Sequence, residues 1–176
     1  FLIGSTSYVE PADVLANVRV LAREVDDIEL VFFDFGMGPP DEETVKELAN
    51  IARDEGISYT VHLPINVYPV NPDPAYAYIA TKILEDFIKA TLPLEPRAYI
   101  LHLETKGKNK IPYPEETMAG WPGRARESLV RILKNISEPR LLALENQPEY
   151  PASRLFPIID ELNPVSYTHL TLPTKA

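Results

Sequence analysis

Residues 41–64 read DEETVKELANIARDEGISYTVHLP and contain one complete unit of the repeat that organises this chain. The stretch 41–55 carries apolar residues at helical spacing, and Gly56 follows it, a residue type favoured just after a helix. The stretch 58–64 is short, apolar and rich in β-forming residues, which is typical of a buried parallel strand. The unit therefore predicts a helix that leads into a strand of a parallel sheet.

The same alternation recurs along the chain. Further apolar runs lie at 2–8, 28–35, 98–104 and 140–147, and further helical stretches at 11–24, 73–91, 115–135 and 151–162. In the helix expected over 11–24, Pro11 takes an early helical position. This order predicts an α/β fold, either a doubly wound sheet or the first five units of a TIM-type barrel. The 176 residues are fewer than the roughly 250 of a closed barrel, so we expect a truncated one. A nucleotide-binding doubly wound sheet lacks support, because Gly4-Ser-Thr-Ser7 has no glycine-rich phosphate-loop spacing.

Composition excludes several classes of protein. With 45% hydrophobic and 24% charged residues the chain is globular, neither disordered nor fibrous. Its 17 Lys and Arg against 26 Asp and Glu give a net charge of −9, which argues against binding duplex nucleic acid. It has no cysteine, so a metal would need His and carboxylate ligands. We see no apolar run of membrane-spanning length and no signal peptide, and therefore expect a cytoplasmic protein with no membrane partner.

The last residues have a different origin from the rest. Residues 165–174 read VSYTHLTLPT, which matches a frame translation of a common transposon sequencing adaptor. We therefore expect 1–164 to be natural sequence and 165–176 to be a non-native tail. On this interpretation His169 has no function, and the parent gene continues beyond Pro164.

Chemistry-bearing residues occupy the predicted strand ends, the place where a barrel carries its reacting groups. Asp34 ends the second strand, His62 the third, His102 the fourth and Glu145 the fifth. A single strand-end histidine is more often structural, but here both natural histidines take equivalent positions between carboxylates. We predict that His62, His102 and Glu145 bind a divalent metal, zinc or manganese. Asp34 is the candidate catalytic residue, which positions a water or binds a second ion. Weaker candidates are Glu104, Asn146 and Gln147.

These residues also carry a resemblance. Residues 62–66, His102 and residues 144–146 resemble the pattern of the xylose-isomerase-like barrels, which include type IV apurinic endonucleases and many sugar isomerases. Within that superfamily, the chain is most similar to the cobamide-remodelling phosphodiesterases. The residues that carry this closer resemblance are 6–8, 11–18, 25–30 and 59–64. The resemblance implies a metal-dependent hydrolase that opens the nucleotide loop of vitamin B12-type corrinoids at its phosphodiester. It also implies His62, His102 and Glu145 as metal ligands.

Residues near the predicted rim are candidates for substrate contact. We expect Tyr8, Asn66 and Tyr68 to contact substrate and Trp121 to form an apolar lid, although packing is the plain alternative for each aromatic residue. Tyr113 lies in the same long loop as Trp121. The local basic residues, which would meet a phosphate or the corrin periphery or else form a solvated surface, are Lys106, Lys108, Lys110, Arg124 and Arg126.

Three other functions stay open. A sugar isomerase or epimerase of the same superfamily would use the same metal to orient a hydroxyl and a carbonyl. A non-catalytic binding barrel would lack the remaining ligands, which related barrels carry on strands six to eight. Repair of duplex DNA ranks lower because of the acidic balance. Since those three strands lie beyond Pro164, we expect the 176-residue chain itself to be inactive. The sequence predicts no oligomeric state.

Overall fold

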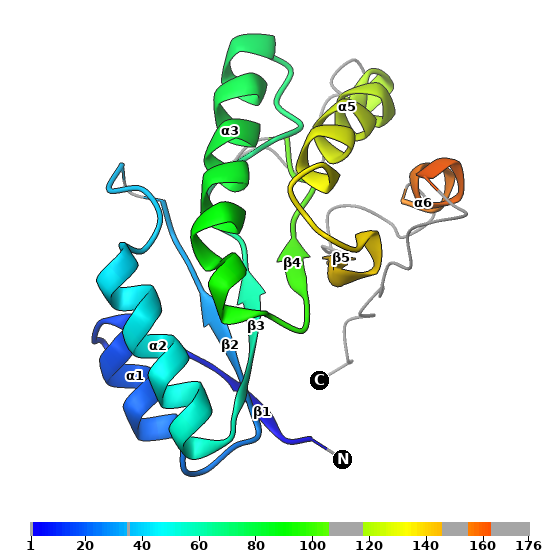
Figure 1. The fold of residues 1–176 in the computed structure, drawn as a ribbon. Coiled ribbons are helices and arrows are strands. Elements are labelled where there is room, and N and C mark those ends of the chain that lie inside the picture. Colours follow the sequence, from blue (N-terminus) through cyan, green and yellow to red (C-terminus); the bar gives the residue numbers. More distant parts are fainter. Residues whose placement is uncertain (1, 35, 106–117, 146–154, 163–176) are drawn as a thin grey trace.

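A computed structural model of the chain describes residues 2–34, 36–105, 118–145 and 155–162. Strands and helices alternate along it (Figure 1). The strands are β1 Gly4–Thr6, β2 Asp27–Val31, β3 Ser58–His62, β4 Tyr99–Leu101 and β5 Leu142–Leu144. The helices are α1 Val14–Leu21, α2 Glu42–Glu55, α3 Pro74–Thr91, α5 Trp121–Leu133 and α6 Phe156–Leu162, with 3-10 turns η1 Leu92–Leu94 and η2 Pro139–Leu141.

The five strands form one parallel sheet in the order β1-β2-β3-β4-β5. A doubly wound sheet reverses its strand order partway along, whereas a barrel adds each strand beside the previous one. The sequential order therefore confirms the barrel interpretation and excludes the doubly wound alternative. The strands are shorter than the apolar runs that predicted them, because each run continues into the loop beyond its strand.

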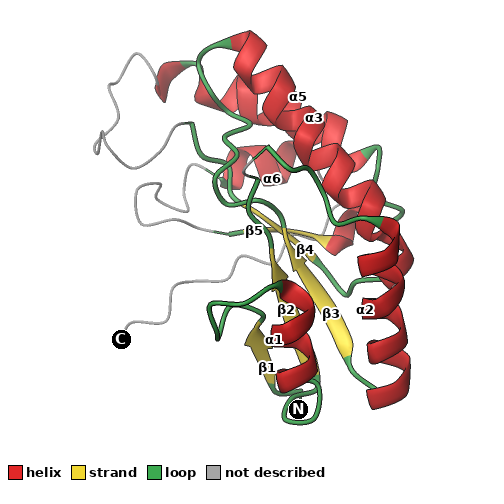
Figure 2. Ribbon diagram, turned by 90° about the vertical axis from the view of Figure 1, so that its left-hand side faces the viewer, coloured by secondary structure: helices red, strands yellow, loops and turns green. Residues whose placement is uncertain are grey.

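Consecutive helices pack side by side outside the sheet. Contacts join α1 to α2, α2 to α3, α3 to α5 and α5 to α6, and Figure 2 shows α2, α3 and α5 together on one side of the sheet. Consecutive right-handed crossovers between sequential strands place every helix on the same face. The described residues thus form five successive β/α units of a barrel wall.

Capping residues explain where the helices begin and end. The Asp41 carboxylate accepts a hydrogen bond from the Thr44 amide at the start of α2, and Gly56 ends that helix at a φ of 74°. The expected bounds of α2 and α3 are confirmed. The prediction that Pro11 lies inside the first helix is wrong, because Asp13 caps α1 and the helix begins at Val14.

Side chains of alternate residues face opposite sides of each strand. Ile28 and Leu30 of β2 are fully buried in the core that joins the sheet to the helices. The other side of the sheet, which corresponds to a barrel interior, carries polar residues on β2 and β3: Asp27 accepts hydrogen bonds from Ser58 Oγ at 2.5 Å and Thr60 Oγ1 at 2.9 Å. This face of the sheet and the strand ends above it are therefore where polar side chains can do chemistry.

None of the helices in the described ranges is both long and apolar enough to cross a bilayer. The tail predicted to be non-native, 165–176, lies outside those ranges, so its origin stays a prediction.

Candidate metal centre

Three neighbouring strand ends bring His62, His102 and Glu145 together. His62 is the last residue of β3 and His102 follows the last residue of β4. Glu145 follows β5, and its amide extends the ladder by donating to the Leu101 carbonyl at 3.0 Å. Because β3, β4 and β5 are parallel neighbours, their carboxyl ends meet at one edge of the sheet.

Both imidazole rings converge on one carboxylate oxygen. Glu145 Oε2 lies 3.2 Å from His62 Nε2 and 2.9 Å from His102 Nε2. The two rings meet edge to face, with centroids 4.7 Å apart. One donor atom from each residue lies within 4.8 Å of the other two. The predicted ligands therefore form one compact cluster of two nitrogens and one carboxylate.

The chemistry of the donor atoms fits a divalent cation. The Leu63 carbonyl, which only accepts hydrogen bonds, lies 2.8 Å from His62 Nδ1, so Nδ1 carries the proton. Nε2 then either donates to the Glu145 carboxylate, when the ring is doubly protonated, or presents a lone pair toward it, when the ring is neutral. Two electron-rich atoms at 3.2 Å repel each other unless a proton or a cation lies between them. A metal ligated by Nε2 of both rings and by the carboxylate satisfies all three groups.

A second carboxylate lies behind His102. Glu104 Oε1 is 3.5 Å from His102 Nδ1, on the opposite side of the ring from Glu145. Burial of the ring lowers the pKa of His102, but the Glu104 and Glu145 carboxylates outweigh it and raise the pKa to about 9. Without a metal, His102 is therefore cationic at neutral pH, and a metal ion would replace that positive charge.

The histidines in turn keep Glu145 ionised. Hydrogen bonds from His102 and His62 hold the pKa of Glu145 well below its ordinary value, against the opposing effect of burial. Glu29 of β2 faces the same side of the sheet, and burial raises the pKa of its carboxyl despite the nearby histidines. Glu145 is therefore an ionised carboxylate that can ligate a cation, and Glu29, on the same face of the sheet, is a weaker acid.

Asp34 and Asn66 lie on adjacent loops and are joined. The Asn66 amide oxygen accepts from the Asp34 backbone N–H at 2.9 Å, and the Asn66 amide nitrogen donates to the Asp34 carbonyl at 2.5 Å. The Asp34 carboxylate accepts from the Gly36 amide at 3.0 Å. Both hydrogen-bonding ends of the Asn66 amide therefore hold the loop after β2, a role that the prediction of substrate contact missed.

Tyr8 and Tyr68, two of the residues predicted to contact substrate, lie on loops that follow strands. Tyr8 follows β1, is 68% exposed, and packs against Phe33 with ring centroids 5.8 Å apart. Tyr68 is half-buried in the loop between β3 and α3. Their contact with substrate stays a prediction.

The prediction that Trp121 forms a lid is wrong. Its side chain is fully buried at the start of α5, and its indole N–H donates to the Leu103 carbonyl at 3.1 Å. Gly120 and Pro122 flank Trp121 and are residue types common in loops, which is why the sequence suggested a loop here. In the structure Pro122 lies in the first turn of α5. Proline is favourable there because the backbone N–H groups of the first turn have no partner within the helix. Arg124, from the predicted basic group, donates to the Val70 carbonyl at 3.1 Å.

The remaining candidate residues lie away from the cluster or outside the described residues. Arg126 is exposed on α5. Lys106, Lys108, Lys110, Tyr113, Asn146 and Gln147 lie outside the described residues.

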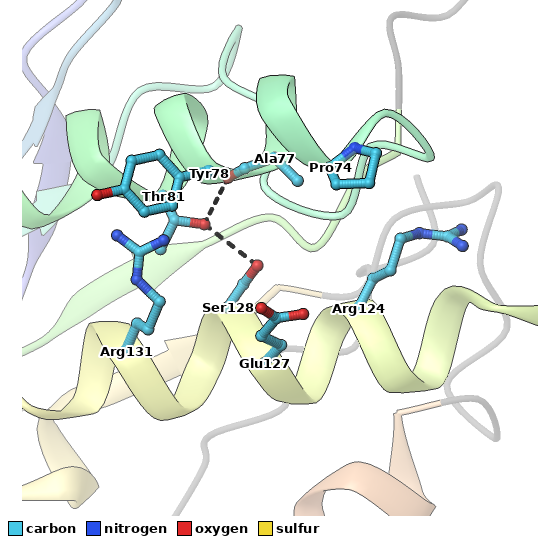
Figure 3. Close-up of a pocket in the computed structure, with 8 residues that line it drawn as sticks. All are labelled: Pro74, Ala77, Tyr78, Thr81, Arg124, Glu127, Ser128 and Arg131. Carbon is cyan, nitrogen blue, oxygen red and sulfur yellow. Dashed lines mark hydrogen bonds between the residues drawn. The ribbon is translucent and has the colours of Figure 1, made fainter.

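A pocket of about 110 Å³ lies away from these strand ends, between α3 and α5 (Figure 3). Thr81 Oγ1 donates to Ser128 Oγ at 3.2 Å across the two helices. Arg131 packs over the Tyr78 ring at 4.5 Å and pairs with Glu85 at 2.9 Å. These contacts hold the two helices together, so the pocket is part of the outer helical packing.

Solved structures share this fold. No family model matches the chain, and no curated protein matches it. A D-tagatose 3-epimerase-like protein superposes with a TM-score of 0.70 at 16% identity, over 92% of this chain and 61% of its own. Endonuclease IV from Thermus thermophilus gives a TM-score of 0.57 at 12% identity, over 82% of this chain and 51% of its own. A xylose isomerase-like TIM barrel protein from Mycobacterium smegmatis, solved with magnesium, gives 0.59 at 13% identity, over 89% and 54%.

These likenesses concern the fold, and the chain spans about 61% of the length of the first of these structures. The five-stranded parallel sheet thus has the fold of the corresponding part of these TIM barrels, which confirms the predicted fold class.

Proposed function

We propose that this chain belongs to a metal-dependent enzyme that acts on a small molecule, with a divalent cation, zinc or manganese, bound by His62, His102 and Glu145. One observation carries the proposal: both histidine Nε2 atoms lie within 3.2 Å of the same Glu145 oxygen. The M. smegmatis barrel solved with magnesium supports the idea that a protein of this fold can bind a divalent cation.

The reaction that we propose is hydrolysis, with a phosphodiester as the bond that is cleaved. Two histidines and one carboxylate with an open coordination position are typical of hydrolytic zinc sites. A bound cation there supplies an acidified water and neutralises phosphoryl oxygens. The chain's own contribution is to orient these groups: the Leu63 carbonyl fixes the His62 ring, and Asn66 holds the loop that carries Asp34. In this proposal Asp34 positions the attacking water.

The substrate we propose is a vitamin B12-type corrinoid, opened at its nucleotide-loop phosphodiester. Support comes from the sequence resemblance at 6–8, 11–18, 25–30 and 59–64 to the cobamide-remodelling phosphodiesterases. A corrinoid is large and rich in amides, so it needs a wide rim with aromatic and hydrogen-bonding groups. The exposed Tyr8 ring, packed on Phe33, lies on such a rim loop.

A sugar epimerase or isomerase is the second candidate, and the structural comparisons favour it. The D-tagatose 3-epimerase-like protein superposes more closely than endonuclease IV, with TM-scores of 0.70 and 0.57. In this case the same cation would hold a hydroxyl and a carbonyl of a ketose. Proton transfer would need a general base near the substrate carbon.

The test has two stages. Zinc and manganese are titrated calorimetrically into the 176-residue chain and its His62→Ala, His102→Ala and Glu145→Gln variants, with the exposed Glu43→Gln as the control. Loss of binding in the three variants and full binding in the control support the metal centre. Full metal content in any of the three overturns it.

The second stage uses the full-length protein, loaded with metal. It is incubated separately with cobalamin, with ketose sugars and with a duplex that contains an abasic site. Release of the lower-ligand nucleoside from cobalamin supports the corrinoid phosphodiesterase. Turnover of the sugars or of the duplex alone overturns it in favour of that reaction.

A further inference from the structure

Glu104 is a buried carboxylate with no part in the mechanism so far. Its residue is 7% exposed, and its Oε1 lies 3.5 Å from His102 Nδ1. Burying an ionised carboxylate is costly unless a positive charge or a hydrogen-bond donor faces it. His102 Nδ1 faces the carboxylate at an ion-pair distance, although no hydrogen bond joins these two atoms in this structure. Glu104 therefore has a specific neighbour in the metal cluster.

Two backbone contacts fix the segment that carries Glu104. The Glu104 carbonyl accepts from the Val70 amide at 3.2 Å, and the Leu103 carbonyl accepts from the Trp121 indole at 3.1 Å. Trp121 is itself fully buried. The chain beyond β4 is thus held by the loop after β3 and by the start of α5, so the carboxylate stays beside the ring.

The two histidines differ in what faces Nδ1. For His62 it is the carbonyl of the next residue, Leu63, at 2.8 Å. For His102 the corresponding carbonyl, that of Leu103, instead accepts the Trp121 indole N–H. Glu104, one residue farther along, takes the place that the backbone occupies at His62.

We propose that Glu104 is a positioning residue for His102: with a metal bound, the Glu104 carboxylate accepts a hydrogen bond from the Nδ1–H of His102 and thereby holds Nε2 toward the metal. The inference rests on the proposed metal centre. Carboxylates in this position orient metal-ligating histidines and make them better ligands, and their loss typically costs 10–100-fold in metal affinity.

The experiment measures zinc affinity of the 176-residue chain by competition with a chromophoric chelator. Glu104→Leu should weaken binding 10–100-fold, whereas Glu104→Gln, whose side-chain oxygen still accepts a hydrogen bond, should weaken it less. Glu85→Gln is the matched control, because Glu85 also forms a largely buried pair, with Arg131, but on the outer helices. It should leave zinc affinity unchanged.

A second readout separates positioning from general damage to the fold. In proton NMR spectra of the zinc-loaded chain, the Nδ1–H of His102 should be protected and shifted downfield by the carboxylate. Glu104→Leu should abolish or move that signal while the Nδ1–H of His62 stays in place as the internal reference. Partial rescue by Glu104→Gln further supports the proposal.

The failures are distinguishable. If the unaltered chain binds no zinc, the metal centre fails and this inference with it. If it binds zinc, and Glu104→Leu keeps both the affinity and the His102 signal, then the role of Glu104 alone is refuted. Equal losses of affinity in Glu104→Leu and Glu85→Gln refute it as well, because general destabilisation then explains them.

Discussion

Replacing Asn66 by alanine should release the loop that carries Asp34. The Asn66 side chain forms two hydrogen bonds to the Asp34 backbone, at 2.9 and 2.5 Å, across 32 residues of sequence. Its residue is half-buried, so both Asp34 groups lose a partner that water only partly replaces. Each such bond contributes about 0.5–1.5 kcal/mol. The free energy of unfolding should therefore fall by about 1–3 kcal/mol.

Urea unfolding measures the loss, and amide hydrogen exchange locates it. In Asn66→Ala the Asp34 amide should exchange faster, since its acceptor is gone. In Asn66→Asp a side-chain oxygen still accepts from that amide while the bond to the Asp34 carbonyl is lost. That variant should be destabilised yet keep the Asp34 amide protected.

Asn71→Ala is the control in the same loop, because the Asn71 side chain accepts from the nearby Asp73 amide, at 3.0 Å, and not from Asp34. It should leave exchange at Asp34 unchanged. The reasoning is refuted if Asn66→Ala leaves the Asp34 amide as protected as before, whatever happens to overall stability.

Three further substitutions each test one feature that stabilises the fold: a buried tyrosine, a buried tryptophan and a glycine at a helix end. Burial raises the pKa of Tyr59 well above 10.0, so the stability it provides is fully present below pH 10 and is lost as the pH rises further. Tyr59→Phe, which removes the bond to the Leu48 carbonyl, should flatten that alkaline loss in urea titrations. Trp121→Ala should cost about 3–5 kcal/mol of unfolding free energy in the same assay. Gly56→Ala, at a φ of 74°, should lower the melting temperature, and an unchanged value would contradict the strain at this position.

Much of the fold follows from local patterns in the sequence. Each strand is a short apolar run and each helix has one apolar face, and these periods do not depend on distant parts of the chain. The end of α2 at Gly56 is a clear case, because a left-handed residue there favours glycine. The choice of a barrel over a doubly wound sheet needed the order of the strands, which periodicity does not contain.

The candidate site divides in the same way. His62, His102 and Glu145 were found because each follows an apolar run, and strand ends of a parallel sheet share one edge. The partners of Asn66 and Trp121 were missed because both bond to backbone groups of distant segments, Asp34 and Leu103. Any residue type offers such groups, so the sequence carries no signal for them.

The residues proposed to bind the metal and those proposed to orient them come from neighbouring segments of the chain. The proposed ligands come from three consecutive strands, and the groups proposed to orient them, the Leu63 carbonyl and the Glu104 carboxylate, lie on the extensions of the first two of these strands. Trp121 of α5 closes the set by holding the Leu103 carbonyl. These contacts among the described residues all lie within 58–105 and 118–145. Metal affinity and substrate turnover are therefore separable measurements, and the first tests the cluster without any assumption about which reaction it performs.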